Sequence, residues 1–244
     1  MAASVGVSGF STLLIWNYFR ILEMLSISGP SQTRDVIDVT SHDSDDDYRE
    51  FVAGIASGGE ISIEGNLIVE DEHGQIAFYT DLQAGEKRTA WIVMPMAVGA
   101  SLLFEAIAKG FSPSAPHEDK IGVSATLQVT GKPTLYVAQS AGMTGLTGIE
   151  ENLGAALTIT PAIAAGTYEY ACTVNTASTW VKLTVTAAGH IIKAQGVTQT
   201  SGVQGDAIAL NPAGEDTEIF ILVYESPTVK SPRLYLLTVT RPAA

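Results

Sequence analysis

The sequence is poor in cysteine and in basic residues, and it has no long apolar run. Its one cysteine, Cys172, excludes a disulfide within the chain and favours folding in the cytosol. Against 26 acidic residues stand 13 basic ones, a net charge of −13. Because phosphate binding needs clustered lysine and arginine, this balance excludes a protein that grips nucleic acid.

The longest apolar run near the start, "FSTLLIW", is too short to span a bilayer. No lysine or arginine precedes it, so the basic region of a secretory signal is missing. We therefore expect a soluble protein that does not insert into a membrane.

Enzyme motifs are also missing from the sequence. There is no glycine-rich phosphate loop, no G-x-S-x-G elbow and no H-E-x-x-H helix. The four histidines are scattered, and Cys172 has no cysteine partner for a zinc site. We expect no enzyme activity, no catalytic residue, no cofactor and no bound metal. Cys172 itself lies in an alternating run, which favours a small strand residue over a nucleophile.

What the sequence does contain is typical of β-structure. Hydrophobic residues make up 46% of it, charged residues 16%, and valine, isoleucine and threonine recur in short runs. Alternation in "GEISIEGNLIVE" predicts a strand with Ile61 and Ile63 on one face. In "HGQIAFYTDLQAGE" the helical spacing of apolar residues predicts one short helix that ends at Gly85. A second helical turn is expected in "DDYREFVAGIA".

Two domains are expected. Residues 139–156 are rich in glycine, alanine, serine and threonine, which predicts a linker. It separates a first domain, residues 1–138, from a second, residues 157–244. The second domain has turns every eight to twelve residues, as a β-sandwich does. Residues 1–17 are apolar, and we interpret them as an arm that orders against a neighbouring subunit.

An aspartate cluster lies in "DVIDVTSHDSDDDYREFVAG", which begins at Asp35. It does not fit a calcium loop of the EF-hand type, because Tyr48 stands where glycine is needed and Gly54 where the final glutamate is needed. A looser cation site stays open. Paired catalytic carboxylates need different environments, whereas these aspartates share one hydrophilic run. An exposed acidic loop is the favoured interpretation.

The first domain resembles the major tail tube proteins of long, non-contractile-tailed bacteriophages. The pattern runs through "ISGP", "IDVTSHDS", "REFVAG" and "GGEISIEGN", then "DLQAG", "FSPSAPHEDK" and "VTGKPT". The resemblance implies a mainly β fold: a tail-tube β-sandwich or barrel with one flanking α-helix, followed here by an immunoglobulin-like β-sandwich. It implies a structural subunit whose six copies close a ring. Such rings would stack around a channel that conducts DNA during ejection.

The same resemblance implies the partners and the place of the protein. These are other copies of itself, the tape measure, tail terminator and tail tip proteins, and DNA that passes without tight binding. The protein would be part of the virion tail, after assembly in the host cytoplasm. A tail-tip or cell-envelope adhesion protein built on the same fold is the alternative.

The resemblance to tail tube proteins also implies a loop at residues 41–57 that contacts a neighbouring subunit or faces the channel, with Phe51 packing inward to anchor its far end. The expected contact residues are Ser41, His42, Asp43, Asp45, Asp46, Asp47, Tyr48, Arg49 and Phe51.

The second domain resembles the cadherin-like or immunoglobulin-like sandwiches of bacterial and phage surface proteins, from "LTITPAIAAGTYEYACTV" to "YLLTVTR". The resemblance implies a domain displayed on the outside of the tube, with weak adhesion to host-surface carbohydrate. Tyr168 and Trp180 are candidates for stacking on a sugar, and the alternative is that both are core aromatics.

Overall fold

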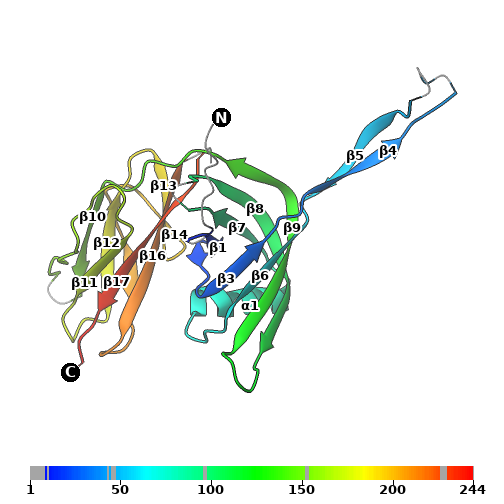
Figure 1. Ribbon diagram of the computed structural model, residues 1–244. Helices are drawn as coiled ribbons and strands as arrows, with labels where there is room; N and C mark the ends of the chain where they lie inside the picture. Colours follow the sequence, from blue (N-terminus) through cyan, green and yellow to red (C-terminus); the bar gives the residue numbers. More distant parts are fainter. Residues whose placement is uncertain are drawn as a thin grey trace, which may run out of the picture. The chain divides into compact units, whose positions relative to one another are not determined.

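The computed structural model describes residues 9, 11–42, 44, 48–95, 98–151, 154–225 and 230–243. They are mainly strand, with one α-helix in the described part, so the predicted fold class is confirmed. The chain divides into two compact units (Figure 1). One comprises residues 21–91 and 103–134, and the other residues 1–20, 92–102 and 135–244.

The unit of residues 21–91 and 103–134 is built on strands of a seven-stranded sheet. Its strands follow one another in the order β7-β8-β9-β6-β3. Their bounds are Met24–Ser28 (β3), Glu60–Asn66 (β6), Lys87–Val93 (β7), Ser101–Ser114 (β8) and Gly122–Tyr136 (β9). In β6 the predicted alternation is present, with Ile61 and Ile63 buried between exposed neighbours. The register of β6 on β9 pairs Ile61 with Leu127 and Ile63 with Ala125, so one face of the sheet is apolar.

A short helical segment covers that apolar face. It consists of a π-helical turn, η2 (Glu72–Ile76), and helix α1 (Ala77–Ala84). The predicted helix end is confirmed: Gly85 has the left-handed φ of 69° and its N–H bonds the Asp81 carbonyl oxygen. Phe78 is buried beneath the helix, and the strands curve around α1 (Figure 1).

A two-stranded hairpin projects from this unit (Figure 1). Its strands are β4 (Thr33–Asp38) and β5 (Phe51–Ser57). The second helical turn predicted in this region was wrong, because residues 51–57 pair with β4 instead. Val36 lies opposite Ala53 and Ile37 opposite Val52. The cross-strand pair of Ile37 and Val52, both β-branched, favours the extended conformation.

The other unit contains a β-sandwich of two sheets. A three-stranded sheet has the order β10-β12-β15 and a five-stranded sheet the order β11-β17-β16-β13-β14. Their bounds are Gly145–Glu150 (β10), Glu169–Thr173 (β11), Trp180–Thr186 (β12), His190–Ala194 (β13), Val197–Gln199 (β14), Gln204–Ala209 (β15), Asp216–Glu225 (β16) and Arg233–Thr240 (β17). Side chains from both sheets, including Leu183 and Ile221, form one buried core.

Part of the predicted linker is a strand of this sandwich. Gly145–Glu150 is β10, which pairs with β12 over its whole length. Gly148 is buried there, where a Cβ would lie 2.7 Å from a Leu157 methyl and 2.8 Å from the Lys182 carbonyl oxygen. A glycine in this stretch therefore permits close packing and not flexibility.

The residues before β10 are also held. The Ser140 N–H bonds the Ser231 carbonyl oxygen at 3.0 Å, and the Met143 N–H bonds the Tyr235 hydroxyl at 3.1 Å. The Arg233 Nε donates to the Ser140 carbonyl oxygen at 2.5 Å. These bonds attach residues 140–143 to the sandwich.

The apolar N-terminal segment forms a hairpin, β1 (Leu13–Trp16) and β2 (Phe19–Arg20). Leu14, Ile15 and Trp16 are fully buried. The Phe19 ring meets Phe220 edge-on at 6.3 Å, and the Lys193 ammonium lies 4.6 Å from the Tyr18 ring centroid. Burial, followed by the electrostatic interaction and the hydrogen bond with Tyr18, raises the pKa of Tyr224 to about 12. The described part of the expected arm thus packs within its own chain.

Candidate functional site

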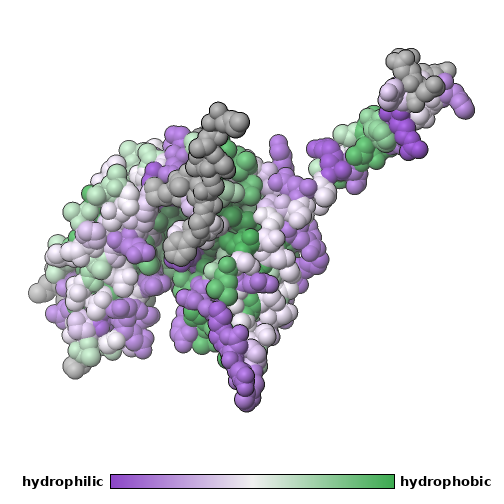
Figure 2. All heavy atoms as spheres, viewed as in Figure 1, coloured by the Kyte–Doolittle hydropathy of each residue, from purple (hydrophilic) through white to green (hydrophobic). Residues whose placement is uncertain are grey.

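The β4–β5 hairpin exposes apolar side chains that core packing would normally bury. Val36 is 66% exposed, Phe51 54% and Ile55 81%. The pairing with β4 places Val36 and Phe51 on one side, which we call the hairpin apolar face, whereas a register shift between Arg34 and Val36 breaks the alternation before Ile55. Figure 2 shows hydrophobic surface along this projecting hairpin. An isolated two-stranded hairpin is marginally stable in water, and exposed apolar patches mark contact sites, so this face needs a cover.

The predicted loop residues have mixed outcomes. Asp43, Asp45, Asp46 and Asp47 lie outside the described residues. Phe51 does not pack inward as predicted, because it is more than half exposed at the start of β5.

The other loop residues lie at the surface. Tyr48 is 77% exposed, and Ser41 and His42 are exposed as well. The Arg49 guanidinium lies 3.7 Å from the Asp38 carboxylate, with both side chains open to solvent. Hydrogen bonds from Thr40 lower the pKa of Asp38. The structure therefore brings these residues to the far end of the hairpin, and whether they contact a subunit or a channel stays a prediction.

The described residues offer no metal centre and no membrane helix. No group of three or more His, Cys, Asp or Glu side chains among them is placed to hold a metal ion. In the same part of the chain no helix is both long and apolar enough to cross a bilayer.

The face of the sheet turned away from α1 is polar, and we call it the polar sheet face. It consists of the exposed positions that alternate with core residues on β3, β6, β7, β8 and β9. Its described members are Ser26, Ser28, Glu60, Ser62, Glu64, Lys87, Glu105, Ile107, Lys109, Ser124, Thr126 and Gln128. Half of these side chains carry a hydroxyl or an amide, and all the others except Ile107 are charged.

Both lysines of the polar sheet face have a carboxylate partner. The Lys87 ammonium lies 2.7 Å from the Glu105 carboxylate, and Lys109 pairs with Glu60. Among the described residues of this face, three glutamates stand against two lysines, a formal charge of −1. The alternation of glutamates in "GEISIEGN" was visible in the sequence, but the pairing of the lysines with carboxylates on other strands was not.

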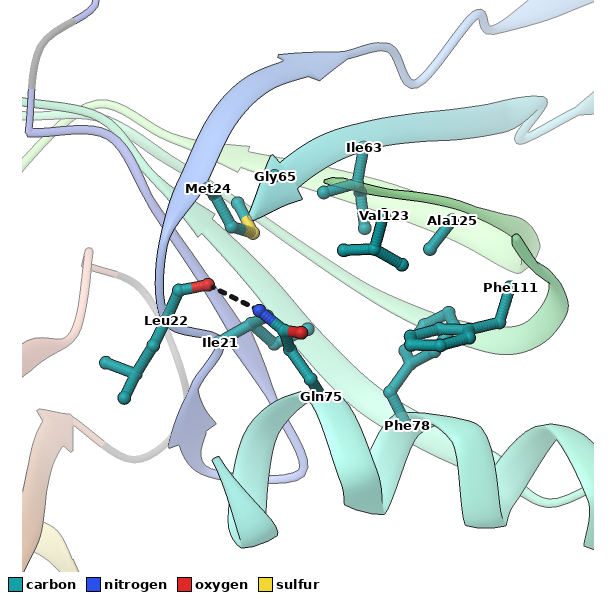
Figure 3. Close-up of a pocket in the computed structure, with 10 residues that line it drawn as sticks. All are labelled: Ile21, Leu22, Met24, Ile63, Gly65, Gln75, Phe78, Phe111, Val123 and Ala125. Atoms are coloured by element: carbon teal, nitrogen blue, oxygen red, sulfur yellow. Dashed lines mark hydrogen bonds between the residues drawn. The ribbon is translucent and has the colours of Figure 1, made fainter. Parts of the chain in front are cut away.

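An apolar pocket lies between the sheet and the helical segment, on the opposite side from the polar sheet face. It is lined by β3, β6, β8, β9 and the helical segment (Figure 3), and its volume of about 20 Å³ leaves room for only one or two water molecules. Phe78 and Phe111 lie in its wall with ring centroids 6.4 Å apart. Gln75 is the polar side chain in the lining, and its amide is already bonded. Its Nε2 donates to the Leu22 and Asn66 carbonyl oxygens, and its Oε1 accepts from the Ile68 N–H.

The two candidate sugar contacts lie at opposite ends of strand β11. Tyr168 precedes β11, whereas Trp180 follows the turn at its other end. The Tyr168 ring stacks on Tyr235 at 5.4 Å, and its hydroxyl accepts a bond from Arg233. The Lys182 ammonium lies 5.3 Å from the centroid of the partly exposed Trp180 ring. The fold does not bring the two rings into one site, and a ligand for either stays a prediction.

Comparison with known proteins gives two family matches. Residues 6–136 match the model described as lambda phage tail tube protein, TTP, and residues 154–242 match a cadherin-like β-sandwich domain. No curated protein matches the chain.

Among solved structures, a chain of the native gene transfer agent virion is 18% identical with a TM-score of 0.45, covering 53% of this chain and 98% of its own. A chain from the tail of an empty gene transfer agent particle, refined with C6 symmetry, gives the same values. A chain from the sheath/tube terminator of an extracellular contractile injection system, PVC, is 12% identical with a TM-score of 0.46, covering 55% and 99%. Similarity at this level supports no conclusion about function.

The family matches confirm the resemblance seen in both halves of the sequence. The tail tube model covers more than half of the chain, and it includes the curved sheet, helix α1 and the β4–β5 hairpin. This is a family of structural proteins and not of enzymes. The chain is therefore a member of the lambda phage tail tube protein family that carries a cadherin-like β-sandwich after its tube domain.

Proposed function

We propose that this tail tube protein forms stacked hexameric rings whose channel conducts DNA during ejection, with the polar sheet face lining the channel. The observation that carries the proposal is the chemistry of this face. A channel that grips a polyanion would stop it, because each freely exposed lysine that meets a phosphate adds to binding. On the polar sheet face both described lysines are held by glutamates, and hydroxyl groups occupy most other positions.

The subunit contacts of the tube would involve the β4–β5 hairpin. Its exposed apolar side chains would contact other copies of the same chain, since rings and stacks are made of one repeated chain. The loop residues Ser41, His42, Tyr48 and Arg49 lie at the far end of the hairpin and would make the polar rim of the same contact. The tape measure, tail terminator and tail tip proteins would be further partners after assembly in the host cytoplasm.

The cadherin-like sandwich would lie outside the tube and provide weak adhesion to host-surface carbohydrate. Both side chains are partly exposed, but Tyr168 already stacks on Tyr235 and bonds Arg233, so Trp180 is the better candidate of the two predicted aromatics. Glycan binding by the isolated domain, compared between Trp180→Ala and the unchanged domain, tests this part.

The experiment for the channel removes the carboxylate partners of Lys87 and Lys109. The double variant Glu60→Gln/Glu105→Gln changes the formal charge of the polar sheet face from −1 to +1 per subunit. Glu118→Gln/Glu215→Gln makes the same charge change at two exposed loop positions and is the matched control. We expect all three proteins to form hollow tubes by electron microscopy. Only tubes of the Glu60/Glu105 variant should retain DNA, and this retention should fall steeply as salt is raised.

Two results would contradict the proposal, and they separate its parts. An unmodified protein that stays monomeric at high concentration with the initiating tail-tip complex would contradict tube formation and support an adhesion protein on the same fold. Tubes of the Glu60/Glu105 variant that retain no more DNA than the control would show that this face does not line the channel.

A further inference from the structure

We propose that His190, Glu225 and Lys230 form a proton-sensitive clasp. Below neutral pH the His190 ring takes up a second proton, pairs with Glu225 and tightens one end of the cadherin-like sandwich. His190 begins β13 and lies directly opposite Glu225, the last residue of β16. Lys230 lies shortly before β17. The clasp belongs to the sandwich alone, so it does not depend on tube formation.

The two ring nitrogens of His190 have different surroundings. Nδ1 lies 2.8 Å from the Ala188 carbonyl oxygen, and because a carbonyl oxygen only accepts, Nδ1 carries a proton. In the neutral ring Nε2 then has a lone pair and no proton. This nitrogen is buried and has no hydrogen-bond partner in the described part of the chain, and the nearby Glu225 oxygen, at 3.8 Å, is an acceptor as well. A neutral His190 therefore leaves a buried polar atom unsatisfied, which is costly.

Glu225 is held in its ionised form. The Lys230 ammonium lies 2.8 Å from its Oε1 atom. The hydrogen bond from Lys230 lowers the pKa of Glu225, burial opposes this, and the charges of Lys230 and His190 and a bond from the Ala141 N–H lower it further. The His190 and Glu225 side chains are only 10% and 22% exposed, so solvent screens an attraction between them weakly.

A second proton on His190 changes both features at once. It converts Nε2 into a donor that faces the carboxylate, so the buried atom gains a partner and an ion pair forms. Among the described residues, Glu225 and Lys230 are the charged side chains that pair within this group. Arg233, on the neighbouring strand β17, donates instead to the Ser140 carbonyl oxygen and the Tyr168 hydroxyl.

The clasp connects three segments of the sandwich. Through Glu225 it joins the start of β13 at His190, the approach to β17 at Lys230, and the residues before β10 at the Ala141 N–H. A partner that favours the charged ring stabilises the fold while the ring is protonated, and this stability is lost as the pH rises and the ring becomes neutral. Because the pKa of Glu225 is lowered, the contribution of the carboxylate is present above the value of a free glutamate and is lost as the pH falls further. The clasp is therefore tightest between about pH 4.3 and about pH 6.5, the values of free glutamate and free histidine.

Melting temperatures of the full chain at about pH 8 and about pH 5 test the clasp. The proteins are the unmodified chain, His190→Gln, Glu225→Gln and the double variant. We expect the melting temperature lost in His190→Gln to be larger at the lower pH by about 2–4 °C. In the Glu225→Gln background, His190→Gln should cause no such additional loss on acidification. The matched control is His117→Gln, an exposed histidine between β8 and β9, whose effect should be the same at both pH values.

Nitrogen-15 chemical shifts of the imidazole rings in the unmodified chain test the proton itself. We expect the Nδ1-protonated tautomer of His190 at about pH 8 and both nitrogens protonated at about pH 5. The His190 signal is assigned by its loss in His190→Gln or, if that variant does not fold, by replacing the other three histidines. The proposal is overturned if the His190 ring is still neutral at the lower pH. It is also overturned if the loss in His190→Gln is equal at both pH values, or if its increase persists in the Glu225→Gln background.

Discussion

Replacing Asp71 by alanine should destabilise the helical segment that covers the sheet. Asp71 is only 4% exposed, and its carboxylate accepts three backbone hydrogen bonds. Two come from the helix start, from the Gly74 N–H at 3.1 Å and the Gln75 N–H at 2.8 Å. The third comes from the Leu22 N–H at 3.1 Å, which ties a distant segment to the helix. Alanine removes the acceptor of all three donors at once.

The size of the effect follows from these three donors. A buried N–H without a partner costs about 1–3 kcal/mol, and the lower figure for each gives a loss of about 3 kcal/mol. At about 4 °C per kcal/mol for a domain of this size, the melting temperature should fall by about 12 °C. Asp71→Asn keeps one acceptor oxygen, so its loss should be about half as large. Calorimetry measures the shift, and hydrogen exchange should show faster exchange at Leu22, Gly74 and Gln75.

The matched control is Glu72→Ala, which changes an exposed carboxylate in the same turn. Exposed substitutions usually stay within about 0.5 kcal/mol, or about 2 °C here. If Asp71→Ala melts within that range of the control, or if the amide of Leu22 exchanges no faster, the carboxylate does not hold these segments together. The reasoning about the helix start would then be refuted.

Three further outcomes are expected. Burial raises the pKa of the Cys172 thiol to about 11, so the stability that comes from burying this thiol should be complete below about pH 9 and lost as the pH rises through 11. In a denaturation series, Cys172→Ala should therefore reduce the fall of the unfolding free energy at alkaline pH. Gly196→Val should loosen the N-terminal hairpin more than Gly202→Val in hydrogen exchange, because both glycines have positive φ but only at Gly196 would a Cβ meet Phe19, at 3.1 Å. Tyr235→Phe should lower the free energy of unfolding, measured by chemical denaturation, by about 1–3 kcal/mol, because the buried Met143 N–H loses the hydroxyl that accepts its hydrogen bond.

The parts of the fold that depend on local sequence were predictable, and those that depend on distant partners were not. Helix α1 and its end at Gly85 follow from spacing within a dozen residues. The spacing of Phe51, Val52 and Ile55 also fits a helical face, and it predicted a helical turn where β5 forms. What decides the conformation there is the pairing with residues 33–38, which a local pattern does not contain.

The candidate site was harder to predict because its residues do not lie where residues of their types usually lie. Valine, isoleucine and phenylalanine normally indicate core, and the resemblance to tail tube proteins implied that Phe51 packs inward, whereas the fold leaves it exposed on a projecting hairpin. Small residues between 139 and 156 suggested flexibility, whereas Gly148 lies within β10 and is small because Leu157 and Lys182 approach it closely. In both places the neighbour that gives the residue its role is distant in the chain.

The polar sheet face and the core are linked by the alternation of a single strand. In β6, Glu60 and Glu64 lie on the polar sheet face, while Ile61 and Ile63 lie on the apolar side. A slip of one residue would exchange these faces, and would bury carboxylates against α1 while exposing isoleucine on the polar sheet face. The register on β9, which pairs Ile61 with Leu127, is thus required by the core as well as by the proposed lining of a channel. If the polar sheet face lines a channel as proposed, a stable core and the release of DNA depend on the same register of the same strand.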